Sequence, residues 1–472
     1  MKRRDFFRKT SLATAGISLS PLLFASGENE KASLLLTNLK NEAKNIIFLV
    51  SDGMSAGTLT LADLYAQKTT GKHTVWIENY KNGRFRRAMM DTASMNSLVT
   101  DSAAGGSAWG GGVRVPNNAL NVGGNGEHYL PILQKFKKQG KKVGCVTTVA
   151  ITHATPASFC VNNESRNNQS EIAEQYLDLK FDLMLGGGDK YFSAEKRRDK
   201  KDLYHQFSTA GFDVVKTKDE LNNTRDSRAP LLGVFANDDL PYAIDHAQDK
   251  TLENTLPNIV EMTTLALEKL KNHPKGFVLQ VEGGKVDWAA HANDSAGLIF
   301  DQLAFDQALK VVLDFAIEDK NTLVIVTTDH GNANPGLFAG RNVNENFARF
   351  KTMKSSNTSI IEQMKTLPTV PQFIEWIENK QGYVISNEEA KSLLADVESL
   401  SEEEAEDYYK LPFEKFAQIQ KRYTNVGFGD MDHSADFVEC AAFGPGSELL
   451  PPFIENTFLH NMMLKACGVE VK

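Results

Sequence analysis

Short apolar runs bounded by turn residues recur along the chain, as expected of strands buried on both faces of a parallel sheet. They cover residues 45–50, 142–148, 183–185, 277–281, 323–327 and 437–443. Between them lie stretches with apolar positions at helical spacing, at residues 130–139, 172–179, 259–270, 296–315 and 458–467. This alternation predicts an α/β fold with a large, mostly parallel central sheet and helices on both faces.

Acidic residues follow directly after three of the predicted strands. They are Asp52, Glu282 and Asp329, the last with His330 beside it. In open α/β sheets, binding sites gather just beyond the carboxyl ends of the strands. The sequence therefore predicts one shared cation site at this edge.

Two further carboxylate and imidazole pairs extend this set. Asp287 and His291 are four residues apart and share one face if the segment is helical, and Asp432 directly precedes His433. Each pair alone is equally compatible with a solvated helix or a hydrogen-bonded loop. Together the carboxylates and imidazoles exceed what one zinc ion can use, which favours a hydrolytic site with two metals.

A candidate nucleophile, Ser102, lies in a segment of small residues at 99–109. Small residues let an anion approach the backbone. A serine at the start of a helix is more often only an N-cap, and that alternative stays open on local evidence. The segment has no G-K-[ST] pattern and so is not a nucleotide-binding P-loop.

The pattern changes to polar, charged helices between residues 335 and 427, which we interpret as an inserted helical subdomain. Its acidic run at 402–406 is typical of a solvated helix face rather than of a calcium or partner site. Because the segment leaves after Asp329 and His330 and returns just before His433, we expect it to shape access to the site. A packing or dimer element is the alternative.

The charge and cysteine content of the chain limit the kinds of partner that it is expected to bind. The formal net charge is −8 and the chain has no basic stripe, which argues against a nucleic-acid binding role and favours small substrates. The four cysteines are widely separated and show no C-x-x-C spacing, so we predict no essential disulfide and no thiolate zinc site.

The first 26 residues have the features of an export signal. Arg3 and Arg4 precede Phe6 and an apolar stretch at 12–24, as in a twin-arginine signal, and small residues follow. The stretch is too short and too often interrupted to span a bilayer well, although a membrane anchor is the alternative. We therefore expect a cleaved signal, a periplasmic or secreted mature protein, and no membrane span in that form.

Several short segments occur in the order found in alkaline phosphatases. They are residues 45–54, 100–104, 153–157, 186–188, 281–283 and 328–330, Asp287 with His291, and His433. From about residue 44 to the C-terminus, excluding much of the insertion, the chain resembles that family. The resemblance implies a catalytic domain over 40–472 that hydrolyses small phosphate monoesters and releases inorganic phosphate. The resemblance is compatible with a homodimer but does not decide the oligomeric state.

The resemblance also implies a role for each matching residue. The first zinc ion would be held by Asp287, His291 and His433, the second by Asp52, Asp329, His330 and the Ser102 oxygen, and a third ion, usually Mg²⁺, by Asp52, Thr155 and Glu282. Ser102 would form the phosphoserine intermediate. Arg166 would clamp the phosphate, and Asp101 would orient Arg166.

Two positions depart from the pattern of some family members. His153 stands where some carry aspartate, and Trp288 where some carry lysine. A nitrogen ligand beside the third site favours Zn²⁺ or Co²⁺ over Mg²⁺. Trp288, near the substrate, removes a cation from the phosphate's neighbourhood.

The same residues argue against several related functions. Sulfatases begin from a C-x-P-x-R nucleophile segment, which this sequence lacks, and Arg166 favours a dianionic monoester over a diester. A cytosolic phosphoglycerate mutase would carry no export signal. An inactive metal- or phosphate-binding protein is disfavoured because every candidate ligand is present together with Ser102.

Overall fold

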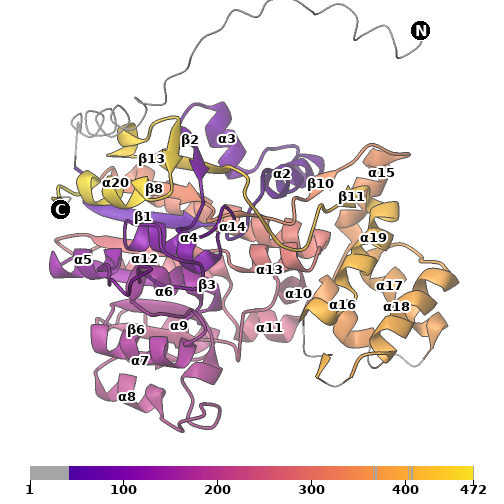
Figure 1. Ribbon diagram of the computed structural model, residues 1–472, viewed down its shortest axis with the longest axis horizontal. Helices are drawn as coiled ribbons and strands as arrows, with labels where there is room; N and C mark the ends of the chain where they lie inside the picture. The colour runs from indigo at the N-terminus through magenta and orange to yellow at the C-terminus, as the bar shows by residue number, and fades with distance from the viewer. Residues whose placement is uncertain (1–41, 365, 367–368, 402, 405–407, 471–472) are drawn as a thin grey trace, which may run out of the picture. The chain divides into compact units, whose positions relative to one another are not determined.

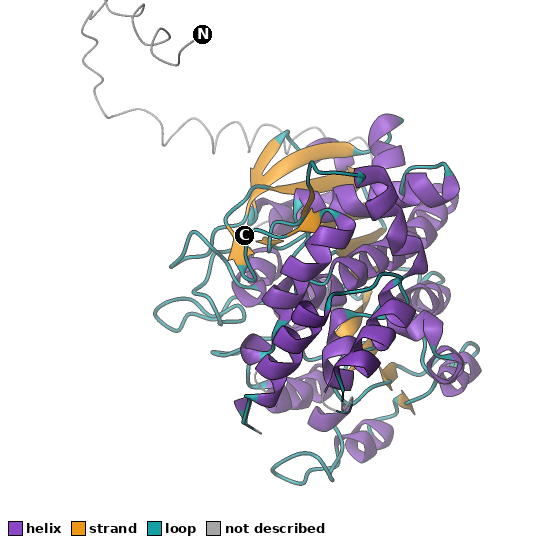
Figure 2. Ribbon diagram, turned by 90° about the vertical axis from the view of Figure 1, so that its right-hand side faces the viewer, coloured by secondary structure: helices purple, strands orange, loops and turns teal. Residues whose placement is uncertain are grey.

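The computed structural model describes residues 42–470, apart from 365, 367–368, 402 and 405–407. The predicted export signal at 1–26 lies outside the described residues. Ten strands form one sheet in the order β14-β2-β13-β8-β1-β7-β3-β4-β6-β5. In that order their bounds are Phe453–Glu455, Arg86–Asp91, Val438–Phe443, Thr322–Thr327, Asn45–Val50, Phe277–Glu282, Lys142–Ala150, Leu183–Gly187, Leu231–Val234 and Asp213–Val215. Helices flank the strands in Figure 2.

The central strands are buried along their whole length, which explains why their sequences are continuous apolar runs rather than alternating ones. All six residues of β1, β7 and β8 are buried, and β1 pairs in parallel with both neighbours. Such burial requires cover on both faces. The predicted α/β class with a mostly parallel sheet is confirmed.

Successive β1 side chains reach opposite layers of helices. Ile47 and Leu49 belong to the core shared with one layer, whereas the Phe48 ring lies 5.0 Å from Trp109 and 5.1 Å from Phe159, between ring centroids. The first layer contains α2 (Ala56–Thr70), α3 (Val75–Lys81), α9 (Lys218–Asn223), α12 (Ile259–Leu270) and α14 (Ser295–Asp319). The opposite layer contains α4 (Ser102–Gly110), α5 (Ile132–Lys138), α6 (Ala154–Cys160) and α20 (Phe458–Ala466).

The prediction of a parallel strand at 437–443 was wrong in direction. The strand exists as β13, but it runs antiparallel to β8 and β2. The reason is the point at which the chain returns to the sheet. His433, in β12 (His433–Ser434), pairs with Asn332 in β9 (Gly331–Asn332), just past the carboxyl end of β8. A strand that starts from this edge must run the opposite way.

Among the described residues of 335–427 there are five α-helices: α15 (Val343–Ala348), α16 (Asn357–Met364), α17 (Val370–Gln381), α18 (Asn387–Glu398) and α19 (Phe413–Thr424). In Figure 1 these orange helices gather to one side of the sheet. Their buried residues, such as Phe347 and Phe416, join one core with Ala289 of α13 (Lys285–His291) and Ile299 of α14. The segment starts and ends in a short antiparallel pair, β10 (Gly336–Leu337) with β11 (Val426–Gly427).

The remaining helices are α7 (Gln169–Leu179), α8 (Leu203–Thr209), α10 (Ala243–Gln248) and α11 (Lys250–Thr255). Among the described residues, no helix is both long enough and apolar enough to cross a membrane. Cys145 in β3 and Cys440 in β13 are fully buried, as small hydrophobic residues within strands are expected to be.

Candidate active site and metal centres

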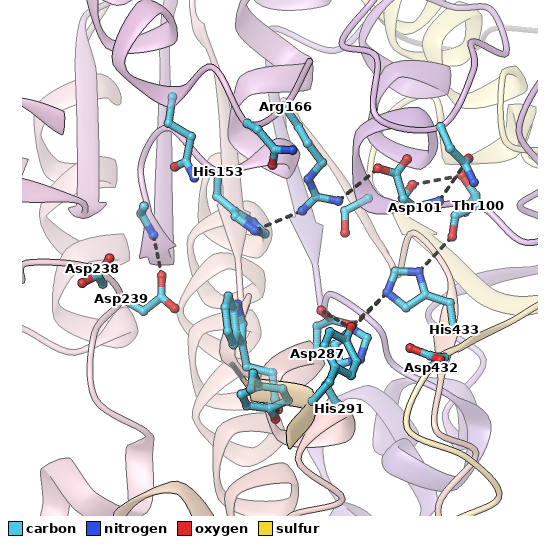
Figure 3. A pocket seen from close by; sticks show the side chains of 18 of the residues that line it. Thr100, Asp101, His153, Arg166, Asp238, Asp239, Asp287, His291, Asp432 and His433 are labelled. Carbon is cyan, nitrogen blue, oxygen red and sulfur yellow. Dashed lines mark hydrogen bonds and ion pairs between the residues drawn. The ribbon is translucent and has the colours of Figure 1, made fainter. Parts of the chain in front are cut away.

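A cavity of about 1030 Å³ is lined by Ser102, Arg166, Asp287, His291 and His433, among others. The residues predicted from the strand ends, Asp52, Glu282, Asp329 and His330, are buried and are not part of this lining. Figure 3 shows Arg166, Asp101, His153, Asp287, His291 and His433 directed toward the cavity from different segments of the chain. Three groups of carboxylates and imidazoles among the described residues have ligand atoms close enough to share a cation. They are Asp287 with His291 and His433, Asp52 with Asp329 and His330, and Asp52 with His153 and Glu282.

The first group combines α13 with the segment that returns from the insertion. Because α13 is helical, Asp287 and His291 share one face, with 3.4 Å from Asp287 Oδ2 to His291 Nε2. The Nε2 atoms of His291 and His433 are 3.1 Å apart. Their Nδ1 atoms lie 2.6 Å from the Met431 carbonyl and 2.9 Å from the Thr100 carbonyl. Donation from Nδ1 leaves both Nε2 lone pairs facing the same point, the arrangement usual for metal-binding histidines.

The second group lies beside Ser102. His330 Nε2 is 3.2 Å from Asp329 Oδ2, 3.6 Å from Asp52 Oδ1 and 3.3 Å from Ser102 Oγ. Asp52 Oδ1 and Asp329 Oδ2 are buried and make no hydrogen bond to any described residue. Buried carboxylate oxygens that accept no hydrogen bond are costly unless a cation satisfies them. The group therefore fits a metal ion.

The third group is built mainly from oxygen ligands. Thr155 Oγ1 donates to Asp52 Oδ2 at 3.2 Å, and Thr147 Oγ1 donates to Glu282 Oε2 at 2.5 Å, while Glu282 Oε1 is buried without a described partner. His153, the one nitrogen-bearing residue of this group, contacts Arg166 instead of the carboxylates. Its Nε2 lies 3.0 Å from Arg166 Nη2, and a guanidinium can only donate, so Nε2 accepts. In this arrangement the neutral ring carries its proton on Nδ1, so His153 could bind a cation only through an Nε2 released by Arg166.

Asp101, and not Ser102, caps helix α4. Its Oδ1 accepts from the Ala104 amide at 2.9 Å, and its Oδ2 accepts from Arg166 Nη1 at 3.1 Å and from the Asn118 amide at 3.0 Å. The carboxylate thus fixes the helix start and the guanidinium together. Ser102 is the first residue of the helix, and its hydroxyl is left to face His330.

The small residues of α4 also serve close helix packing. A Cβ on Gly106 would lie 2.3 Å from Ser158 Oγ, and one on Gly105 would lie 3.2 Å from Asp329 Cβ. Larger residues would push α4 away from α6 and from the end of β8. The glycines therefore set the position of Ser102 relative to the second group.

Electrostatics within the site reflect an excess of buried acid. Burial raises the pKa of Asp52, and the charges of Asp329 and Asp287 raise it further. Burial also raises the pKa of Glu282 to about 7. For His291 burial acts to lower the pKa, but Asp287 more than offsets it and raises the pKa to about 9. A cluster that protonates to relieve repulsion is one that divalent cations would neutralise.

Trp288 and its neighbours form another part of the cavity wall. Lys285 Nζ lies 5.5 Å from the centre of the Trp288 ring, and Tyr408 of the insertion donates from its hydroxyl to the Trp288 carbonyl at 2.9 Å. Asp432, paired with His433 in the sequence, is exposed at the rim and belongs to none of the three groups.

Residues that position the ligands were not singled out from the sequence. Asn332 Nδ2 donates to Asp287 Oδ1 at 2.7 Å, and Thr328 Oγ1 donates to the His330 carbonyl at 2.9 Å. Thr147 was also missed. Thr328 and Asn332 follow a predicted strand close to Asp329, and Thr147 lies near the end of another predicted strand. Their placement at strand ends was the available signal.

An α/β sheet with a serine, an arginine and three candidate cation-binding groups at its carboxyl edge is typical of a metal-dependent hydrolase. The family model "Alkaline phosphatase" matches residues 43–469, and the chain therefore belongs to the alkaline phosphatase family. It is an enzyme, a phosphoric monoester hydrolase, and the resemblance found in the sequence is confirmed.

Relatives match over nearly the full chain. Alkaline phosphatase 4 of Bacillus subtilis is 34% identical, covering 98% of this chain and 99% of the relative. The crystal structure of Thermus thermophilus alkaline phosphatase is 31% identical with a TM-score of 0.86, covering 96% of this chain and 97% of that one. A TAB5 alkaline phosphatase, 25% identical with a TM-score of 0.65 and covering 92% of this chain and 100% of that one, was solved as a histidine-to-aspartate variant with magnesium bound in its M3 site.

Proposed function

We propose that this phosphomonoesterase works through a covalent phosphoserine on Ser102, over two zinc ions and a third divalent cation. The observation that carries the proposal is the position of Ser102 Oγ, 3.3 Å from His330 Nε2 in the second group. When bound, the cations would supply positive charge that stabilises the seryl oxygen and the transferring phosphoryl group. Asp287, His291 and His433 would hold the first zinc ion, and Asp52, Asp329 and His330 the second.

The chain's own groups account for the chemistry at phosphorus. Ser102 Oγ would form a bond to phosphorus as the bond to the ester oxygen breaks on the opposite side, releasing the alcohol. Water would then cleave the phosphoserine, releasing inorganic phosphate and restoring the hydroxyl. The α4 backbone and its Asp101 cap hold Ser102 in place throughout.

Arg166 would bind the equatorial phosphate oxygens. Asp101 and His153 each accept one hydrogen bond from its Nη atoms, at 3.1 and 3.0 Å, so the guanidinium is held before substrate arrives. Each Nη carries a second N–H, which leaves donors for a bidentate contact with a dianionic phosphate.

We predict that Arg166→Lys lowers kcat/KM for an aryl phosphate monoester by roughly 10- to 100-fold, because an ammonium cannot form the bidentate contact. Steady-state kinetics on a monoester and a matched methyl diester measure the effect. The diester carries one negative charge fewer, so its kcat/KM should fall less than that of the monoester. Arg422→Lys, at an exposed ion pair with Glu389, is the matched control. Equal losses for both esters would contradict the clamp.

The third site is proposed to hold magnesium through Asp52, Thr155 and Glu282, with Zn²⁺ or Co²⁺ as alternatives because of His153. Oxygen ligands suit a hard cation, and an imidazole does not. The TAB5 enzyme was solved with magnesium in its M3 site as a histidine-to-aspartate variant. This supports the proposal that the residue at such a position influences which metal the third site holds.

We therefore expect His153→Asp to make activity depend several-fold more steeply on added magnesium, because a carboxylate replaces the imidazole beside Glu282. Magnesium titrations of the parent and variant, each preloaded with zinc, provide the measurement. His205→Asp, at an exposed position in α8, controls for the added charge. Superimposable curves for parent and His153→Asp would rule out a role for His153 in tuning this site.

We also propose roles for the N-terminal segment and for the inserted helices. Residues 1–26 are proposed to be a twin-arginine-type signal whose removal gives a periplasmic or secreted enzyme, and N-terminal sequencing of the mature protein would test this. Residues 335–427 are proposed to form a subdomain at the mouth of the site. The contact of Tyr408 with Trp288 supports this placement.

A further inference from the structure

Two buried cysteines meet where α6 packs on the central sheet. Cys145 lies within β3 and Cys160 is the last residue of α6, and both side chains are fully buried. Their Sγ atoms are 3.8 Å apart. In Figure 1 the helix lies beside the strand. Neither thiol takes part in the chemistry proposed above.

The chain between the two cysteines carries residues of the third group. The cysteines are 15 positions apart, and the segment between them contains Thr147, His153 and Thr155. Thr147 donates to Glu282, and Thr155 donates to Asp52. A covalent bond between the cysteines would therefore close a loop around the part of the chain that builds this group.

The surroundings of the pair suit a neutral dithiol better than a nucleophile or a metal site. Burial raises the pKa of Cys160 well above its usual range, and contact with Cys145 raises it further. Nucleophilic cysteines instead have lowered pKa values, which a nearby cation or a helix N-terminus provides. Cys160 lies at the C-terminal end of α6. Structural zinc sites need more ligands than two thiolates, and among the described residues no candidate metal group contains a cysteine.

We propose that Cys145 and Cys160 form a disulfide when the protein meets an oxidising environment, and that this bond fastens α6 to β3. Bonded sulfur atoms are about 2.05 Å apart, so the two Sγ atoms must approach by about 1.8 Å. Rotation of both side chains and a small movement of the end of α6 would bring them together. The bond would be added to an already folded enzyme, so it does not conflict with the prediction that no disulfide is essential.

The oxidant for this step is an external disulfide. The thiolate of one cysteine attacks a sulfur of the oxidant and releases one thiol, and the thiolate of the other cysteine then displaces the second. Two protein thiols and one external disulfide become one protein disulfide and two external thiols, which carry the two protons that the cysteines lose. Because both side chains are buried, the attack requires local opening of α6 and should be slow in the closed protein.

The test exposes the metal-loaded enzyme to glutathione disulfide a few degrees below its Tm, where local opening is frequent. In most molecules, mass spectrometry of the digested protein should find two peptides joined through Cys145 and Cys160. Dithiothreitol should separate them. The proposal is overturned if both cysteines stay reduced, or if either is found joined to glutathione or to another cysteine instead.

The fastening of α6 is tested by comparing oxidised and reduced protein within each variant. Oxidation should raise Tm by about 3 °C, because a cross-link across a loop of this length restricts the unfolded chain. It should also slow backbone hydrogen exchange across residues 146–160 several-fold. Cys160→Ala should abolish both differences, whereas Cys440→Ala, which removes another fully buried thiol, should keep them.

A cross-link that forms without raising Tm or slowing exchange would show that the bond does not fasten α6. Loss of both differences in Cys440→Ala would equally contradict the assignment to Cys145 and Cys160. Neither measurement depends on turnover, so both stay valid whatever the mechanism of phosphate release.

Discussion

Replacing Ser102 with alanine is expected to lower kcat for aryl phosphate hydrolysis by roughly three orders of magnitude without abolishing it. The loss follows from removal of the only side-chain oxygen that the first turn of α4 places beside His330. A remainder should survive, because the cations and Arg166 would still stabilise transfer of the phosphoryl group directly to water. The alanine fits the helix start without strain, since Asp101 provides the cap.

Acid-quenched enzyme labelled with radioactive phosphate provides the direct test. Label should map to the peptide containing Ser102 in the parent and be absent from Ser102→Ala. Ser107→Ala, one to two turns further along the same buried helix, is the control, because its Oγ donates to the Ala119 carbonyl and accepts from the Asn121 amide. Full activity in Ser102→Ala, or label on another residue, would refute the covalent role.

Removal of metal is expected to have the largest effect, with activity falling below detection and stability falling as well. Each of the three groups contains at least one buried carboxylate, and Asp52 belongs to two of them. Without cations, the negative charges of Asp52, Asp329 and Glu282 repel one another in a buried site. A ligand at 100 times its Kd stabilises a protein by about 2.7 kcal/mol per site, so losing several should lower Tm clearly.

The measurements are metal analysis, thermal unfolding and activity, before and after chelation and after stepwise return of Zn²⁺ and Mg²⁺. We expect about two zinc ions and one further divalent cation per chain in the active enzyme. Asp329→Asn should reduce the zinc content, whereas Asp314→Asn, at an exposed pair with Lys310, should not. A fully active preparation with one metal ion per chain would contradict the three-site proposal.

The local pattern was sufficient for the main strands and for the spacing of some candidate ligands. Residues 45–50 and 277–281 were predicted as buried strands because the interior of a two-sided sheet demands continuous apolar side chains. Asp287 and His291 lie on one face of a helix, as their spacing of four residues predicted, because helical periodicity is a local property of the sequence. By contrast, β2 was missed because its burial is mixed, with Arg86, Arg87 and Met89 exposed.

The sequence by itself determined the α/β class, the acidic strand ends and the residue types of a metal-dependent hydrolase, because these depend on local periodicity and on the chemistry of each side chain. Only the tertiary structure decided the antiparallel direction of β13, the bond of His153 to Arg166 and the right-angled contact of Tyr408 with Trp288. Each of these joins segments that lie apart in the chain. Their meeting depends on how the sheet, α4 and the 335–427 segment pack together, and local spacing carries no information about that packing.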